Sequence, residues 1–289
     1  KGMLVAKTPE EFPEAYATAR KESEIAFGDG TMYIEHFVVN PRHIEFQILA
    51  DSQGNVIHLG ERDCSIQRNH QKMIEESPSA AVSDELREKM GHAAVTAAKA
   101  AGYVNAGTIE FLLEPDGKFW FMEMNTRIQV EHPVTEWVTG IDLVKEQLKI
   151  ASGMPLGITQ DNVRIMGHAI ECRINAENPQ KNFRPSPGKI KGAHFPGGNG
   201  IRVDTCVYNG CKIPPYYDSM LAKLIVHADN RRDAIAKMQS ALGEVIIDGI
   251  DTNIDYQYEI LKNEDYQSGN FDTGFLASHI IAGVKINEN

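Results

Sequence analysis

The chain has 289 residues, long enough for about two domains, and its 29 basic and 40 acidic side chains give a formal net charge of −11. This balance argues against a nucleic-acid binder held by a general positive field, while 42% hydrophobic residues are typical of a globular protein with a core. We expect no membrane span, because no stretch is apolar over a sufficient length, and no signal peptide, because the start lacks an apolar run. The four cysteines form no Cys-x-x-Cys pair, so we expect reduced thiols in a cytoplasmic protein.

The first part of the chain predicts a helix followed by three strands. The helix covers residues 10–27, and the strands cover residues 32–39, 43–50 and 55–60. In the second strand polar residues alternate with apolar ones, which predicts one solvent-facing side that carries His43, Glu45 and Gln47.

The middle of the chain predicts two helices on either side of a hairpin. Ser83 begins a helix that ends at Gly102, and residues 134–151 form the second helix. Asp116-Gly117 is a strong two-residue turn signal, so residues 108–125 are expected to form a β-hairpin.

After a join at about residues 153–163 the pattern becomes strand-rich. Expected elements are strands at residues 168–176, 188–194, 201–207 and 221–228, then helices at residues 231–246, 252–263 and 273–282. The fold class is therefore α+β, with a second sheet-and-helix body after the join.

The hairpin places two acids opposite each other. A two-residue loop at Asp116-Gly117 makes Glu110 face Glu123, with Leu112 facing Phe121 and Glu114 facing Phe119. Two opposed carboxylates repel unless water, a shared proton or a divalent cation compensates them. Oxygen ligands suit Mg²⁺ or Mn²⁺, so a metal site is one interpretation and a plain solvated pair is the other.

Every odd position over residues 123–131 is polar. In an extended chain Glu123, Asn125, Arg127, Gln129 and Glu131 would share one face, able to hold metal, phosphate and a small anion, although a solvated strand can show the same alternation.

Two further groups could meet this face. Residues 61–72 form a polar loop whose Arg62, Arg68 and Lys72 make a local cationic cluster suited to an anion. Arg173 could approach from the second body, while an ordinary solvated loop and a surface ion pair with Glu171 are the alternatives.

Residues 122–133, Met-Glu-Met-Asn-Thr-Arg-Ile-Gln-Val-Glu-His-Pro, resemble the signature of the biotin carboxylases, members of the ATP-grasp superfamily. The resemblance extends from Lys1 to about Ala282 and is nearest to the bacterial members that serve acetyl-CoA carboxylase. It also rests on the stretches Asn40-Pro-Arg-His-Ile-Glu-Phe-Gln47, Glu61-Arg-Asp-Cys-Ser65, His70-Gln-Lys72, Glu171-Cys-Arg173, Pro185-Ser-Pro-Gly-Lys189 and Pro214-Pro-Tyr-Tyr-Asp-Ser-Met220.

The resemblance implies catalytic roles for three residues. Glu131 matches the general base, Arg127 the active-site arginine, and Arg173 the arginine that stabilises the biotin enolate. The family's bicarbonate pocket corresponds to Lys72, Arg127, Gln129, Val130 and Glu131.

It also implies a nucleotide and metal site. Glu110, Glu123 and Asn125 match the ligands of Mg²⁺ or Mn²⁺. The residues that match ATP contacts are Met3, Glu35, His36, Phe37, Val38, His43, His70 and Leu112, together with Glu110 and Glu123.

The implied activity is ATP- and Mg²⁺-dependent carboxylation of biotin on a carrier protein, from bicarbonate through carboxyphosphate, as the first half-reaction of acetyl-CoA carboxylase in fatty-acid synthesis. Implied partners are a biotin carboxyl carrier protein, carboxyltransferase subunits and a second copy of the chain, with neither nucleic acid nor membrane. The implied domains are the remainder of an ATP-grasp lid (residues 1–37), the ATP-grasp main body (residues 38–160) and a biotin carboxylase C-terminal domain (residues 161–289).

One departure from the family concerns the start of the chain. The family's N-terminal domain, most of its Gly-rich loop and two phosphate-binding lysines would precede Lys1, so we expect the chain to be a fragment of a longer protein. The alternatives are the biotin carboxylase part of another acyl-CoA or pyruvate carboxylase, a different ATP-grasp ligase such as the synthetase part of a carbamoyl phosphate enzyme, and an inactive C-terminal fragment.

Overall fold

The computed structural model describes residues 2–286, and the chain forms two compact units, Lys1–Val39 and Asn40–Asn289. The first unit contains helix α1 (Phe12–Phe27), which ends where Gly28 adopts a left-handed φ of 73°. The predicted strand at residues 32–39 is wrong, because these residues are irregular. A strand needs a partner, and the described residues of this unit contain no other strand.

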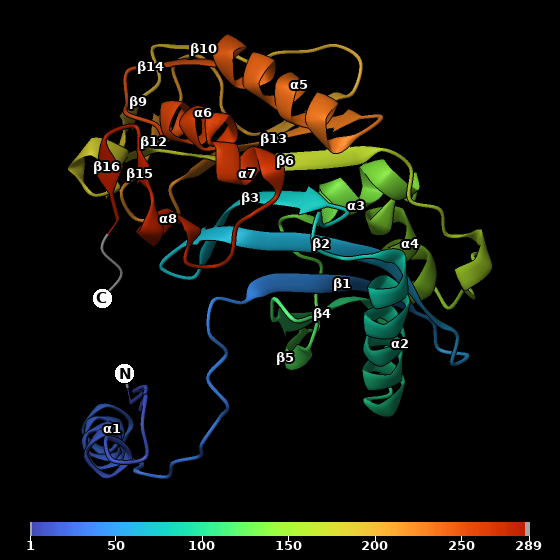
Figure 1. Ribbon diagram of the computed structural model, residues 1–289. Coiled ribbons are helices and arrows are strands. Elements are labelled where there is room, and N and C mark those ends of the chain that lie inside the picture. The colour runs from blue at the N-terminus through green and yellow to red at the C-terminus, as the bar shows by residue number, and fades with distance from the viewer. Residues whose placement is uncertain (1, 287–289) are drawn as a thin grey trace. The chain divides into compact units, whose positions relative to one another are not determined.

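The second unit is built on one antiparallel sheet of eight strands in the order β11-β13-β6-β3-β2-β1-β4-β5, which Figure 1 shows from β13 down to β5. Each neighbouring pair is antiparallel. The strands are β1 (Arg42–Ala50), β2 (Val56–Arg68), β3 (Gln71–Ser77), β4 (Asn105–Leu113), β5 (Phe119–Asn125), β6 (His168–Asn175), β11 (Ile201–Thr205) and β13 (Met220–Ala228).

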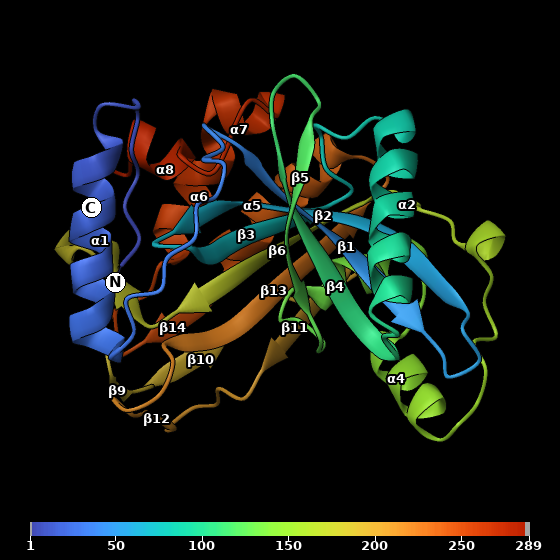
Figure 2. The same ribbon diagram turned by 90° about the horizontal axis from the view of Figure 1, so that it is seen from below.

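Four buried clusters attach the helices to this sheet. Helix α2 packs along β1, β2 and β4 (Figure 2), while α5 and α6 cover β13 and β6 around the largest cluster. Helix α3 lies over β6, β13, β2 and β3, and α4 packs on β4. The helices are α2 (Asp84–Ala100), α3 (His132–Thr139), α4 (Leu143–Ala151), α5 (Arg231–Glu244), α6 (Ile254–Lys262), α7 (Glu264–Ser268) and α8 (Phe275–Ser278).

Short elements connect this framework. They are η1 (Gln160–Asn162), η2 (Pro179–Lys181), β7 (Glu177–Asn178), β8 (Arg184–Pro185), β9 (Gly188–Lys189), β10 (Gly192–His194), β12 (Lys212–Ile213), β14 (Ile246–Asp248), β15 (Ile280–Ile281) and β16 (Val284–Lys285). No helix among the described residues is both long and apolar enough to cross a bilayer.

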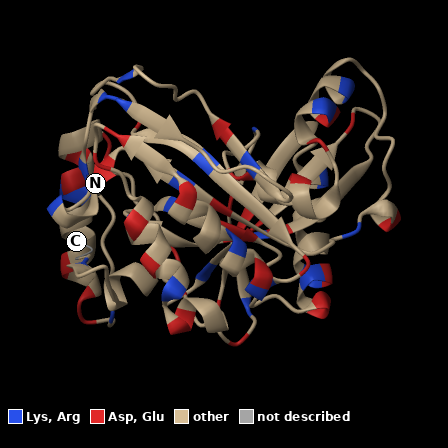
Figure 3. Cartoon of the chain, turned by 90° about the horizontal axis from the view of Figure 1, so that it is seen from above, with Lys and Arg blue, Asp and Glu red and all other residues tan. Residues whose placement is uncertain are grey.

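The predicted solvent-facing side of the second strand is wrong. His43, Glu45 and Gln47 of β1 are all buried, at 7%, 0% and 0% exposure. Acidic and basic residues lie together on the strands at the centre of this unit (Figure 3), and they provide the partners that solvent would otherwise supply.

The predicted polar loop at residues 61–72 is also wrong, because these residues form most of β2 and the start of β3. The turn between the two strands is confined to Asn69 and His70, both with positive φ. Four of the charges that suggest a loop are paired inside the fold, namely Glu61, Arg62, Asp63 and Lys72. Arg68 instead lies over the Phe183 ring, 4.3 Å from its centroid.

The β4–β5 hairpin differs from its predicted register near the turn. The Gly117 N–H donates to Glu114 O at 3.0 Å and the Glu114 N–H donates to Lys118 O at 2.8 Å, which closes a three-residue loop with Gly117 at a φ of 86°. The loop is thus one residue longer than the two-residue turn expected from Asp116-Gly117.

A bulge corrects the register before the acids. Phe111 faces Phe121 and Leu112 faces Trp120, so the predicted Leu112–Phe121 and Glu114–Phe119 pairs are wrong. Met122 then remains unpaired, and beyond it Glu110 faces Glu123 as predicted.

Two predicted helices are shorter than expected. Residues 134–151 form α3 and α4, because Gly140 takes a left-handed φ of 70° and the Asp142 side chain caps the second helix. The predicted helix at residues 273–282 is reduced to α8, after which the chain enters β15.

The predicted join near residue 160 does not interrupt the sheet. Strand β6 follows that join along the chain, yet it pairs directly with β3 from before it. The division of the chain into three domains remains a prediction, and the compact units themselves meet at Val39 and Asn40.

Candidate active site

A row of four charged residues crosses one face of the sheet. Glu45 on β1 pairs directly with Arg62 on β2 and with Glu110 on β4, and Glu110 pairs in turn with Glu123 on β5. Directly opposed residues project from the same face, so three carboxylates lie side by side. Burial decreases along the row, from fully buried Glu45 to exposed Glu123.

Arg62 compensates the buried end of this row. Its Nε donates to Glu45 Oε1 at 2.5 Å, and its two terminal nitrogens donate to Gln47, Thr135, Thr108 and Gln129 at 2.8–3.2 Å. All five N–H groups of the guanidinium are therefore used. The expectation that Arg62 attracts an anion is wrong, because the side chain is fully buried and its charge is matched to Glu45.

Lys72 connects three acids at the centre. Its Nζ lies 2.5 Å from Glu45, 3.2 Å from Glu110 and 2.6 Å from Glu131. Burial alone would raise the pKa of Glu45, but the charges of Arg62 and Lys72 lower it to about 2. Hence this carboxylate is ionised at neutral pH.

Glu110 is held in the same state. Burial opposes its ionisation, yet hydrogen bonding to His43 at 2.9 Å, the charge of Lys72 and the Gln129 amide at 2.7 Å lower its pKa to about 2. An ionised carboxylate at the border between core and solvent is suited to hold a cation.

The opening of the row fits a hard cation. Asn125 Nδ2 lies 3.0 Å from Glu110 Oε1 and 3.1 Å from Glu123 Oε1, so the two acids converge on one small polar group. The same amide turned over would offer its oxygen and complete an all-oxygen set of the kind that Mg²⁺ prefers. The residues present therefore fit the predicted metal.

Two tighter clusters are of another kind. The donor atoms of His43, Glu45 and Glu110, and those of Glu45, Cys64 and Glu131, lie within 4.8 Å of one another. Lys72 bridges the acids of both clusters, and Arg62 pairs with Glu45. Protein cations thus occupy the positions where a metal would supply positive charge.

The strand ends at Asn125, so the alternating polar side chains of residues 123–131 do not all lie on one face. Arg127 is exposed and donates to the Ile128 carbonyl at 3.2 Å, whereas Gln129 is buried against Glu110. An extended strand would have kept the two side chains together, but the turn that leads into α3 separates them.

Glu131 stands at the N-terminus of α3 between two cations. One carboxylate oxygen accepts from Lys72 at 2.6 Å and the other accepts from Arg173 at 3.1 Å. Arg173 is in turn anchored by Glu75 at 2.5 Å. The part of the chain after the predicted join therefore reaches Glu131 through β6, and Arg173 meets the polar residues before that join as the sequence predicts.

The other predicted residues are more scattered. Val130 accepts a hydrogen bond from Lys223 at 2.9 Å through its carbonyl, His70 is exposed in the β2–β3 turn, and Leu112 is half-buried on β4. Five further residues belong to the first unit, where Val38 is buried and the remaining four are exposed: Met3, Glu35, His36, Phe37 and Val38.

Sequence reasoning missed three buried charges of the site. The alternation of the strand predicts a solvent-facing Glu45, the polar loop is predicted to place Arg62 in a cationic cluster, and Glu75 receives no role, yet all three are buried. The strict alternation of β1 was a usable signal for Glu45, since it puts this residue on the same side as His43. Nothing local in the sequence distinguishes Arg62 from its neighbours in a charged run.

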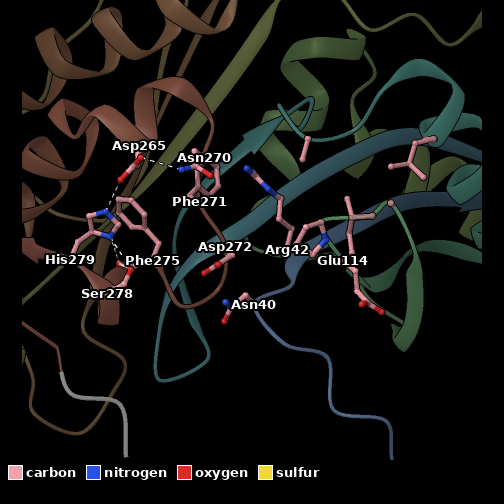
Figure 4. Close-up of a pocket in the computed structure, with 15 residues that line it drawn as sticks. Asn40, Arg42, Glu114, Asp265, Asn270, Phe271, Asp272, Phe275, Ser278 and His279 are labelled. Carbon is pink, nitrogen blue, oxygen red and sulfur yellow. Dashed lines mark hydrogen bonds and ion pairs between the residues drawn. The ribbon is translucent and has the colours of Figure 1, made fainter.

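A separate cavity of about 400 Å³ lies between the start of β1, the β4–β5 turn and α8 (Figure 4). Arg42 extends into it, 4.1 Å from the centre of the Phe271 ring, and bonds to Asp63. None of the predicted site residues lines this cavity, so the candidate site is the charged row and not the hollow.

The family of the chain is shown by comparing its sequence with models of known protein families. Residues 1–159 match the model described as carbamoyl-phosphate synthase L chain, ATP binding domain. This ATP-grasp body carries the charged row. Residues 171–278 match the biotin carboxylase C-terminal domain, which provides Arg173. The chain belongs to the biotin carboxylase family.

Named relatives agree with this assignment. The chain is 55% identical over 284 residues to biotin carboxylase 1 of Bacillus subtilis, covering 98% of this chain and 63% of that protein. It is 54% identical over 275 residues to a pyruvate carboxylase subunit of Methanothermobacter thermautotrophicus, covering 95% of this chain and 56% of that protein. This chain therefore spans about three-fifths of the curated relatives that it matches.

A solved structure shows the same fold. The biotin carboxylase domain dimer of Hydrogenobacter thermophilus 2-oxoglutarate carboxylase, a complex with MgADP, ADP and bicarbonate, is 49% identical with a TM-score of 0.88. The match covers 96% of this chain and 61% of that one.

Proposed function

We propose that the complete protein is a ligase that carboxylates biotin with bicarbonate, using ATP and Mg²⁺. The observation that carries this proposal is Glu131, held between Lys72 and Arg173 on the same sheet face as the acids Glu110 and Glu123. This arrangement joins a base, a row for metal and phosphate, and an arginine from the family's C-terminal domain.

The proposed chemistry assigns the base to Glu131, which takes the proton of bicarbonate. Lys72, Arg127, Gln129 and the backbone of Val130 are proposed to hold the anion, and positive charge near it favours its attack on the γ-phosphate of ATP. This attack forms carboxyphosphate and releases ADP. Carboxyphosphate then breaks down to CO₂ and phosphate, the phosphate takes the N1 proton of biotin, and N1 forms a bond to the carbon of CO₂.

Arg173 is proposed to stabilise the enolate oxygen of biotin. Its guanidinium is already directed at the site by Glu75 and Glu131. A bidentate cation is well suited to an oxygen that gains negative charge during the reaction.

The metal is proposed to be held by Glu110, Glu123 and Asn125, where Mg²⁺ or Mn²⁺ would neutralise phosphate charge. ATP contacts are proposed for His43, His70 and Leu112 in the second unit. By the family resemblance alone, ATP contacts are also proposed for Met3, Glu35, His36, Phe37 and Val38.

The wider setting is part of the same proposal. We propose a biotin carboxyl carrier protein as the bearer of the substrate, carboxyltransferase subunits as partners, a homodimer, and a cytoplasmic location. The proposed acceptor system is acetyl-CoA carboxylase in fatty-acid synthesis. The named relatives include a protein of pyruvate carboxylase, so carboxylation of another acceptor is the competing outcome.

The first test replaces Arg173. We expect Arg173→Ala to lower biotin carboxylation by the complete protein about 100-fold or more, the usual effect of losing a charge stabiliser. Bicarbonate-dependent ATP cleavage without biotin should fall less. Arg184→Ala, an exposed arginine of the same domain, is the control. Wild-type biotin carboxylation by Arg173→Ala would reject the biotin assignment.

The second test concerns the metal. Glu123→Gln should raise the Mg²⁺ concentration needed for half-maximal ATP cleavage, because one anionic ligand is lost. Glu114→Gln, from the same hairpin, should leave that concentration unchanged. An unaltered Mg²⁺ requirement in Glu123→Gln would show that the cation is held elsewhere.

A further inference from the structure

Two acids outside the proposed chemistry lie against each other beneath α3. Glu75 on β3 pairs directly with Glu171 on β6, and both side chains have 0% exposure. Direct pairing puts their carboxyl groups on the same face of the sheet, the face that carries Arg173.

The hydrogen bonds of this pair are incomplete. Glu75 Oε1 accepts from Arg173 Nε at 2.5 Å. Among the described residues, Glu75 Oε2 and both oxygens of Glu171 have no hydrogen-bond partner. A fully ionised, unpaired carboxylate at such a depth is strongly unfavourable, so the pair needs a proton.

The surrounding charges are committed to other groups. Arg173 binds Glu75 and Glu131, and Lys72 binds three other acids. Lys223, on the neighbouring strand β13, lies 3.2 Å from Asp204 and donates to the Val130 carbonyl at 2.9 Å. Among the residues that the structure describes, these three cations and Glu131 are the charged groups that face the pair, together with the buried Cys64 thiol. None of the three cations donates a hydrogen bond to Glu171.

We propose that Glu75 and Glu171 share one proton, with the Glu171 carboxylic acid donating to Glu75 Oε2 directly or through one water, and that the pair positions Arg173 against Glu131. The role assigned to Arg173 rests on the proposed function. Glu75 and Glu171 are positioning residues, since neither touches the reacting atoms.

Among the described residues, one proton accounts for two of the three oxygens of this pair that lack a partner. It gives Glu171 a donor, gives the free oxygen of Glu75 a partner, and leaves one negative charge to anchor Arg173. Burial raises the pKa of Glu171 well above its usual range and raises that of Glu75 to about 7, in keeping with a pair that retains its proton.

The shared proton gives the site a defined response to pH. In the folded protein the pair keeps its proton at neutral pH and releases it as the pH rises. A second negative charge then appears beside Arg173 and competes with Glu131 for the guanidinium. Carboxylation should therefore decline on the alkaline side when the pair ionises.

The proton can be observed without any assay. Infrared spectroscopy of the complete protein in D₂O at neutral pH should show the carbonyl stretch of a buried carboxylic acid, and Glu171→Gln should remove it. Glu76→Gln is the matched control, because Glu76 is a buried acid on the next position that is paired with Arg231 at 2.9 Å and His168 at 3.1 Å. Absence of the wild-type band would overturn the shared proton.

Kinetics test the positioning role. Glu171→Gln keeps an N–H donor for Glu75, whereas Glu171→Leu does not. We expect Glu171→Leu to lower kcat for biotin carboxylation about tenfold, equivalent to roughly 1.4 kcal/mol. Glu171→Gln should recover most of this loss and move the alkaline decline to higher pH. An equal loss in both variants, with an unmoved pH profile, would refute the positioning role.

The two experiments separate this inference from the proposed function. If the wild-type protein carboxylates biotin but lacks the infrared band, the acid pair is wrong and the function stands. If the band is present and Arg173→Ala retains wild-type carboxylation, the shared proton stands but its positioning of a catalytic arginine fails together with the biotin assignment.

Discussion

Two buried acid pairs lie on the same sheet and have opposite states. Glu45 and Glu110 face each other across β1 and β4, and both have a pKa lowered to about 2. Glu75 and Glu171 face each other across β3 and β6, and both have a raised pKa. All four side chains are buried, so burial alone does not separate them.

The difference lies in the cations and donors that each pair receives. Glu45 and Glu110 are contacted by Arg62, Lys72, His43 and the amide of Gln129. Among the described residues, Arg173 is the only hydrogen-bond partner of the second pair. A buried carboxylate thus remains ionised where the protein supplies enough positive charge, and elsewhere it takes up a proton.

Removing the strongest compensating charge should have the largest effect. Arg62→Met leaves Glu45 without its principal partner in a fully buried position, and we expect a loss of about 3–5 kcal/mol in unfolding free energy. Equilibrium denaturation by urea measures this loss. Arg232→Met, an exposed arginine on α5, is the control and should change stability by less than about 0.5 kcal/mol. A similar effect of both substitutions would contradict the importance of Arg62.

Replacing Lys72 should lower the free energy of unfolding by less, because the acids that Lys72 contacts also have other partners. Lys72→Met should cost about 1.5–3 kcal/mol at neutral pH, the scale of hydrogen bonds to charged groups. Unfolding measured over a series of pH values gives this number.

The same variant should weaken the response to acid. In the wild type, the low folded-state pKa of Glu45 and Glu110 adds stability above pH 4.5 that is lost as the pH falls towards about 2. Lys72→Met raises both pKa values, so the decline between those limits should become shallower. An unchanged or steeper decline would mean that Lys72 does not govern these acids.

The smallest change in stability is expected from removing a cation of an exposed ion pair. Lys89 and Glu85 lie 2.7 Å apart on α2, with side chains 63% and 79% exposed. Solvent already stabilises both charges, so Lys89→Met should leave the urea midpoint unchanged within error. A shift approaching that of Lys72→Met would show that depth is not what distinguishes these pairs.

Local signals predicted the elements whose ends are determined by local chemistry. Gly28 ends α1 as expected, and Ser83 caps α2 by accepting from the Leu86 N–H at 3.2 Å. The hairpin was predicted with the correct pair of acids, although Gly117 closes a longer loop and Met122 forms a bulge. The two departures shift the register in opposite directions, which is why Glu110 still faces Glu123.

The same local signals could not predict which distant strands pair or which charges become buried together. Residues 32–39 have strand-like composition but no partner strand among the described residues of their unit, and residues 61–68 have loop-like charge but lie inside β2. A strand depends on its neighbours and a buried charge depends on a distant counter-charge, so neither can be settled from a short stretch of sequence.

The amino-acid sequence was enough to establish the family resemblance, the opposition of Glu110 and Glu123, and the presence of Arg173 among the candidate residues. Which charges are internal became clear from the folded chain: Glu45 is buried with Arg62, Lys72 lies among three acids, and among the described residues Glu75 and Glu171 are hydrogen-bonded by Arg173 alone. The physical reason is that the ionisation state of a carboxyl group depends on charges within a few ångströms in space, which come from strands far apart along the chain.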